Sequence, residues 1–130
     1  MTKRINLSSG AKWEDIIGYS RAVKVGNIIE VSGTAAVDKN NEIVGLNNPY
    51  EQTKFILSKI ESSLLSLGAS LKDVVRTRIF VVNINHWEEI GRAHGEVFHE
   101  IKPVTSMVEV KSLIEPGLLV EIEATAILST

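Results

Sequence analysis

The sequence predicts a single α+β domain in which two helices cover one face of a mixed β-sheet of about six strands. Residues 103–110 and 119–128 alternate apolar and polar side chains with a period of two, which is typical of half-buried strands. Residues 49–67 and 85–101 instead repeat apolar side chains at intervals of three and four, which is typical of amphipathic helices. A chain of 130 residues is long enough for one hydrophobic core and too short for two, so we expect one domain over residues 1–130.

The first third of the chain predicts strands separated by tight turns. Residues 1–10 lack periodicity, and we expect an irregular arm there. Residues 19–25 and 28–34 are predicted strands joined by a hairpin turn at Gly26-Asn27, because both residues tolerate positive φ. A second turn at residues 38–41 precedes a short predicted strand near residues 42–44.

The predicted helices follow. Asn48 as N-cap, Pro49 in the first turn and Glu51 three residues after the cap mark the start of a helix that Gly68 ends. After a predicted strand over residues 74–82, Asn85 repeats the N-cap signal. We expect the second helix to bury a stripe of six side chains: Trp87, Ile90, His94, Val97, Phe98 and Ile101.

One face of the sheet is expected to lack helices. It is predicted to hold charged and polar side chains with apolar ones between them: Tyr19, Arg21, Val23, Arg76, Arg78, Phe80, Thr105, Met107, Glu109, Glu121 and Glu123. Such a face is too charged for a private core and too apolar for open water. Because an uncovered face of this kind is usually buried against another molecule, we expect a homo-oligomer.

Composition excludes several classes of function. The formal net charge of −2 gives no reason to expect nucleic acid as a partner. The chain has no cysteine, and its three histidines have no ligand-like spacing with carboxylates, so we expect neither a metal nor a cofactor. No apolar run is long enough for a membrane helix or a secretion signal, and a cytoplasmic protein is the default.

Five segments in a fixed order resemble the Rid family, the reactive-intermediate deaminases also called YjgF or endoribonuclease L-PSP proteins. The resemblance covers nearly the whole chain and rests on residues 17–19 (IGY), 25–33 (VGNIIEVSG), 74–81 (VVRTRIFV), 103–110 (PVTSMVEV) and 120–124 (VEIEA). It implies a chorismate-mutase-like fold and a homotrimer with clefts between the subunits.

The resemblance also implies roles for individual residues. In archetypal members the cleft hydrolyses 2-imino acids and their enamine tautomers to 2-keto acids and ammonia. By this resemblance Tyr19 lines the pocket, the backbone of Ser32 and Gly33 holds the imine nitrogen, and Glu121 is the catalytic residue that positions water. The archetype's carboxylate-binding arginine is absent, because its motif Pro-x-Arg-Ser reads Pro103-Val104-Thr105-Ser106 here.

The missing arginine affects which substrates the cleft can bind. A hydrogen bond to a charged group contributes roughly 1.5–3 kcal/mol, and a threonine hydroxyl at position 105 offers only one neutral donor. We therefore expect the archetypal 2-imino acid reaction to be weakened by about tenfold to a hundredfold. Arg21 is the candidate replacement for the lost cation, and the alternative is that it forms an ion pair across a subunit interface.

The sequence leaves two main candidate functions and a weaker third one. The first is a trimeric hydrolase that acts on a small imine or enamine through Glu121. The second is a non-catalytic protein that binds small carboxylates or other metabolites in the same clefts. An endoribonuclease is the third, and it rests only on the family's older label. For Glu121 and Tyr19 the structural alternatives are an interface ion pair and an interface aromatic, and for His94 the alternative is hydrogen-bonded packing.

Overall fold

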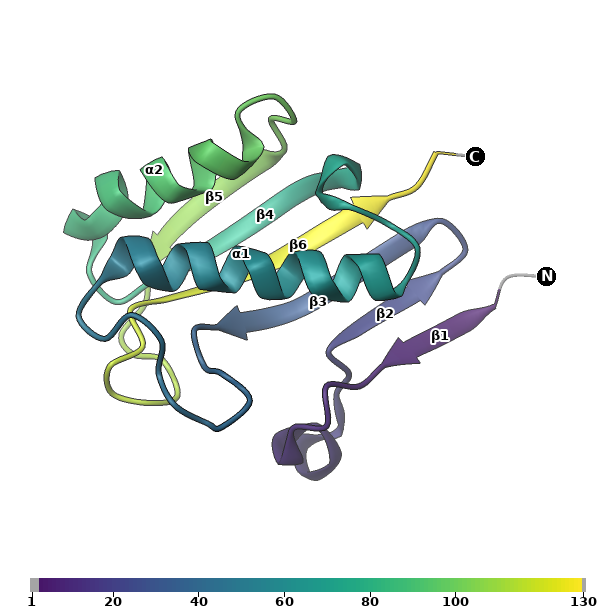
Figure 1. Ribbon diagram of the computed structural model, residues 1–130, viewed down its shortest axis with the longest axis horizontal. Coiled ribbons are helices and arrows are strands. Elements are labelled where there is room, and N and C mark those ends of the chain that lie inside the picture. Colours follow the sequence, from purple (N-terminus) through teal and green to yellow (C-terminus); the bar gives the residue numbers. More distant parts are fainter. Residues whose placement is uncertain (1–2, 130) are drawn as a thin grey trace.

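The computed structural model describes residues 3–129, which form one mixed sheet with two main helices (Figure 1). The strands stand in the order β1-β2-β3-β6-β4-β5, and all neighbours are antiparallel except β4 and β5, which are parallel. Their bounds are β1 Arg4–Leu7, β2 Ala22–Val25, β3 Ile28–Ala35, β4 Val74–Val81, β5 Val104–Glu109 and β6 Val120–Ile127. The predicted α+β class with a six-stranded mixed sheet is confirmed.

Both helices lie on the same face of the sheet, as predicted. Helices α1 (Pro49–Ser66) and α2 (Trp87–Phe98) run side by side across it in Figure 1. Alternate residues of β6 point into the core between sheet and helices, where Ile122 is fully buried against Ile60 and Leu64 of α1. Within residues 3–129, neither helix has the length and apolar character needed to cross a membrane.

The first helix begins and ends where the sequence predicts. The Asn48 side chain accepts a hydrogen bond from the backbone N–H of Glu51 at 3.0 Å, and Gly68 has a φ of +83°, which favours glycine after a helix. The second helix differs from the prediction. Asn83 caps a short turn over residues 84–86, so Asn85 caps nothing, and the Trp87 side chain is 57% exposed instead of buried.

The N-terminal segment is more regular than predicted. Strand β1 pairs with β2 over residues 4–7, so the prediction of an irregular arm is wrong there, while residues 1 and 2 lie outside the described part. A helical turn over Glu14–Gly18 also precedes β2. The hairpin turn is present, but only Gly26 adopts positive φ, and the predicted strand near residues 42–44 is reduced to one bridge between Val37 and Ile43.

Strand β5 is the least well predicted part of the sheet. It pairs with β4 in parallel register, with Thr77 opposite Thr105 and Ile79 opposite Met107. Since Thr77 and Ile79 are buried beneath the helices, Thr105, Met107 and Glu109 point to the helical side. Their predicted place on the uncovered face is therefore wrong. At the sheet edge both faces of a short strand are partly exposed, and alternation alone does not identify the inner one.

The capping geometry yields a direct stability test. Replacing Asn48 by alanine removes the acceptor for the Glu51 N–H, and we expect the free energy of unfolding to fall by about 0.5–2 kcal/mol. Asn85→Ala is the matched control, because its exposed side chain caps no helix and the change should stay within about 0.5 kcal/mol. Chemical denaturation measures both. An equal loss in the two variants would contradict the assignment of the cap.

Candidate functional site

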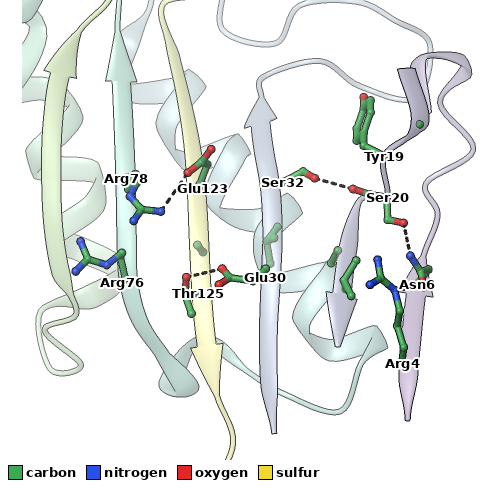
Figure 2. Close-up of a pocket in the computed structure, with 15 residues that line it drawn as sticks. Arg4, Asn6, Tyr19, Ser20, Glu30, Ser32, Arg76, Arg78, Glu123 and Thr125 are labelled. Carbon is green, nitrogen blue, oxygen red and sulfur yellow. Dashed lines mark hydrogen bonds and ion pairs between the residues drawn. The ribbon is translucent and has the colours of Figure 1, made fainter. Parts of the chain in front are cut away.

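The helix-free face carries a polar hollow of about 420 Å³ (Figure 2). Its charged side chains are largely paired across neighbouring strands. Thr125 donates to Glu30 at 2.6 Å, and Arg78 lies 3.6 Å from Glu123. The further labelled residues that line it are Arg4, Asn6, Tyr19, Ser20, Ser32 and Arg76. This face is thus a polar surface with its own internal pairing.

Two of the predicted site residues border this hollow. Tyr19 stands at one end of it with its side chain 38% exposed. The Ser32 hydroxyl donates to the backbone carbonyl of Ser20 at 2.6 Å, which ties β3 to the segment before β2. The remaining predicted residues, Arg21, Gly33, Thr105 and Glu121, lie outside its lining.

Gly33 lies in a β-bulge beneath the Glu121 carboxylate. The register between β3 and β6 shifts between Val31 and Thr34, which places Ala35 opposite Glu121. A Cβ atom added at Gly33 would lie 3.0 Å from the Glu121 Cδ and still closer to one carboxylate oxygen. Glycine therefore permits this close approach, which a side chain at position 33 would obstruct.

Arg21 lies on the other side of the same bulge. Its guanidinium donates to the Gly33 carbonyl oxygen at 2.6 Å. Burial raises the pKa of Glu121, the positive charge of Arg21 partly offsets that rise, and Glu123 adds to it. The Arg21 side chain lines a separate hollow against α1, so its predicted place on the uncovered face is wrong. The backbone leaves regular strand pairing just before β2, and strict alternation fails there.

Thr105 belongs to a polar chain under α2. Its hydroxyl lies 2.7 Å from the Thr77 hydroxyl, which in turn lies 2.9 Å from His94 Nε2. The His94 ring also packs against Phe98 with centroids 4.6 Å apart, and burial lowers the pKa of His94. His94 is therefore a hydrogen-bonded packing residue, and the hydroxyl of Thr105 already has a partner within the chain.

Within one chain, Thr105 does not meet the other predicted residues. Strand β4 separates β5 from β6, and Thr105 and Glu121 point to opposite faces of the sheet. Only Arg21, Gly33 and Glu121 form one cluster, and Tyr19 and Ser32 lie next to it along the chain. A cleft that holds both Thr105 and Glu121 would need side chains from two copies.

Two charged residues near Arg21 were not among the predicted site residues. The Glu14 carboxylate is buried and accepts hydrogen bonds from Ser8 and Ser9. The Lys59 ammonium donates to the backbone carbonyls of Ala35 and Val37 at 3.0 and 2.8 Å. The two serines that precede Glu14 could have indicated a hydrogen-bonded carboxylate there. Nothing in the sequence marks Lys59, because it lies in a predicted helix at a position that looks exposed. Among residues 3–129, no three His, Asp or Glu side chains gather as a metal site.

The fold and site define a class of small α+β domains with a helix-free polar sheet face and a glutamate held over a glycine bulge. Solved structures share the fold. Rv2704 of Mycobacterium tuberculosis, described as a member of the YjgF family, is 47% identical with a TM-score of 0.88, covering 97% of this chain and 100% of that chain. The Rid-family protein YyfA of Yersinia pestis is 29% identical with a TM-score of 0.84, covering 97% and 100%.

Sequence comparisons give the same relationship. The family model described as Endoribonuclease L-PSP matches residues 10–128. The 3-aminoacrylate deaminase RutC of Acinetobacter baylyi is 34% identical over 126 residues, which cover 97% of this chain and 98% of RutC. This chain therefore belongs to the endoribonuclease L-PSP family, also known as the Rid or YjgF family.

The buried histidine predicts a pH dependence of stability. Because burial lowers the pKa of His94 in the folded state, the unfolded chain binds its proton more readily. The free energy of unfolding should thus fall as the pH drops through the ordinary titration range of histidine. We expect His94→Gln, which can keep a hydrogen bond to Thr77, to flatten this dependence. His99→Gln is the control, because that side chain is exposed. Denaturation at several pH values measures the difference, and identical curves for wild type and His94→Gln would contradict it.

Proposed function

We propose that this protein hydrolyses a small imine or enamine and that Glu121 orients the attacking water. The observation that carries the proposal is the placement of the Glu121 carboxylate against the bulge at Gly33, half-buried and beside Arg21. The relationship to RutC, whose name gives 3-aminoacrylate as its substrate, supports an enamine as the substrate class.

Hydrolysis of an imine requires one base near the electrophilic carbon. Glu121 takes a proton from water as the water oxygen forms a bond to the imine carbon. The π pair of the C=N bond moves to nitrogen, which is protonated in turn. The tetrahedral intermediate then loses its hydroxyl proton and its nitrogen gains a proton, both through Glu121, as the C–N bond breaks, and the products are a carbonyl compound and ammonia. An enamine first takes a proton at carbon to become the imine. A carboxylate with a raised pKa suits both the acceptance and the return of a proton.

We also propose that the working form is a homotrimer with its clefts between subunits. The separation of Thr105 from Glu121 within one chain supports this, because a neighbour's β5 edge would be needed to complete a pocket around Glu121 and Tyr19. In such a cleft Thr105 would offer a neutral hydroxyl where archetypal members carry an arginine. We accordingly place the substrate among imines and enamines other than the archetypal 2-imino acids. Light scattering measures the oligomeric state.

The second candidate is a protein that binds small metabolites in the same clefts without turnover. The observation that favours it is the hydrogen bond of Thr105 to Thr77, which engages the residue at the clamp position within its own chain. An endoribonuclease remains a distant third candidate. The net charge of −2 and the use of His94 in packing both count against it.

A coupled assay tests the hydrolase. An amine oxidase acting on a primary amine generates an imine without a carboxylate in situ, and loss of the imine is followed with wild type, with Glu121→Gln and with buffer. We expect wild type to accelerate the loss, and Glu121→Gln to lower kcat/KM by about a hundredfold or more, because general-base catalysis contributes roughly that much. Glu123→Gln is the matched control on the same strand face, since its carboxylate lies near Arg78 instead of the bulge.

Three outcomes are informative. Equal rates for wild type, Glu121→Gln and buffer would contradict hydrolysis of these substrates. Saturable binding of the carbonyl product without turnover would favour the binding protein. Equal losses of kcat/KM in Glu121→Gln and Glu123→Gln would instead indicate that the overall charge of the helix-free face, and not the position of Glu121, determines the rate.

A further inference from the structure

A second hollow lies on the helical side of the molecule, between the N-terminal segment and α1. Its volume is about 230 Å³, and its α1 wall consists of Lys59, Ser62, Ser63 and Ser66. Arg21 closes it on the sheet side. The proposed hydrolysis uses none of the α1 residues, so the hollow needs its own explanation.

Two cations lie here without a close anion. Among residues 3–129, no carboxylate oxygen comes within 4.0 Å of the charged nitrogens of Arg21 or Lys59. Arg21 makes one side-chain hydrogen bond, to Gly33, and its Nε is buried without a partner. Lys59 donates to two neutral carbonyl oxygens and lies over the Phe55 ring, 5.9 Å from its centroid. Burying like charges together is unfavourable unless a counter-charge is supplied.

Burial lowers the pKa of both cations, and a bound anion would raise the pKa of both again. For Arg21, attraction by Tyr19, Glu14 and Glu121 offsets part of the effect of burial on the pKa. For Lys59, the nearby positive charge of Arg21 lowers the pKa further while Asp38 partly offsets the fall. The two side chains therefore feel each other across the hollow.

Three carboxylates attract these cations from more than 4.0 Å away, Glu14 and Glu121 acting on Arg21 and Asp38 on Lys59. The Asp38 carboxylate accepts hydrogen bonds from the backbone N–H groups of Asn40 and Glu42, so it is engaged in its own turn. Glu14 attracts Arg21 from a distance, but its two carboxylate oxygens accept hydrogen bonds from the Ser8 and Ser9 hydroxyls. These serines also border the hollow, and their hydroxyl donors are engaged by Glu14. The free donors therefore come from the α1 wall.

The α1 wall supplies hydroxyl groups. Ser62 and Ser63 make no side-chain hydrogen bond within the described chain, although Ser63 is only 7% exposed. The Ser66 hydroxyl bonds back to the carbonyl of Ser62 and keeps its lone pairs free. A guanidinium, an ammonium and adjacent hydroxyls around one hollow match a group with several acceptor oxygens in different directions.

We propose that this hollow binds a phosphate-type oxyanion between Arg21, Lys59 and the hydroxyls of Ser62 and Ser63. A phosphate has enough acceptor oxygens to reach both the sheet side and the α1 wall, whereas a planar carboxylate has two. The anion supplies the charge that Arg21 and Lys59 lack. Glu121 does not line this hollow, and occupancy of the site does not depend on hydrolysis.

Titration with inorganic phosphate tests the site. Amide shifts in ¹H–¹⁵N NMR spectra are followed at constant ionic strength, with chloride as the balancing anion. We expect saturable shifts confined to residues 8–9, 21 and 59–66. Arg21→Gln and Lys59→Gln should each weaken binding by at least about tenfold, the size expected for one lost charged hydrogen bond. Lys54→Gln is the matched control on the same helix, because Lys54 pairs with Glu96 away from the hollow.

The other outcomes decide against the site or refine it. Shifts no larger than those with chloride, or equal affinity in wild type, Arg21→Gln and Lys59→Gln, would overturn the proposal. If Arg21→Gln fails to fold, Lys59→Gln and Ser63→Ala carry the test. Glycerol 3-phosphate in place of inorganic phosphate separates the two sources of the group: tighter binding of the ester indicates a phosphorylated metabolite. The Glu121→Gln variant, which removes a negative charge near Arg21, should bind phosphate at least as tightly as wild type does, so a failed hydrolase assay and a failed phosphate titration are distinguishable.

Discussion

The close approach of the Glu121 carboxylate to the backbone of Gly33 is the contact on which the rest of the site depends. It requires a register shift in β3, a residue without a side chain at position 33, and a β6 neighbour that points to the helix-free face. The same bulge presents its carbonyl oxygen to Arg21, so residues about a hundred positions apart share one small cluster. Because β3 and β6 are central strands, the carboxylate is carried by regular structure with neighbours on both sides, and a catalytic group gains from such a fixed position.

Arg21 connects two regions that differ in character. On one side it donates to the Gly33 carbonyl and moderates the pKa of Glu121. On the other it faces Lys59 and the serines of α1 across a hollow. Position 105, where the resemblance to the family leads us to expect a carboxylate-binding arginine, holds threonine, and Arg21 does not supply a cation on the open face. Arg21 and Lys59 instead place two positive charges at the hollow against α1, with no carboxylate oxygen of residues 3–129 within 4.0 Å of them, which is why we place an oxyanion there and a different imine or enamine at Glu121.

The sequence was a good guide wherever one local signal determined the structure. The alternation in residues 120–126 gave the correct buried face of β6, and Asn48 with Pro49 gave the correct start of α1. Prediction failed where tertiary pairing decides. The four residues of β1 are too few for a pattern, and the inner face of the edge strand β5 follows from its parallel register with β4. The position of Arg21 depends on a backbone irregularity before β2, and the hydroxyl partner of Thr105 is Thr77 of β4, which in turn contacts His94 of α2. No spacing rule contains that information.

The central claim is that Glu121 is held partly buried against the bulge with Arg21 as its nearest moderating charge. The most direct test follows the side-chain carboxyl ¹³C resonance of Glu121, assigned by its absence in Glu121→Gln, through an NMR pH titration of wild type and of Arg21→Gln. The account predicts a pKa above the ordinary range of glutamate in wild type, because burial disfavours the charged form. It predicts a further rise in Arg21→Gln, where the offsetting positive charge is gone. A pKa in the ordinary range that does not respond to Arg21→Gln would contradict it.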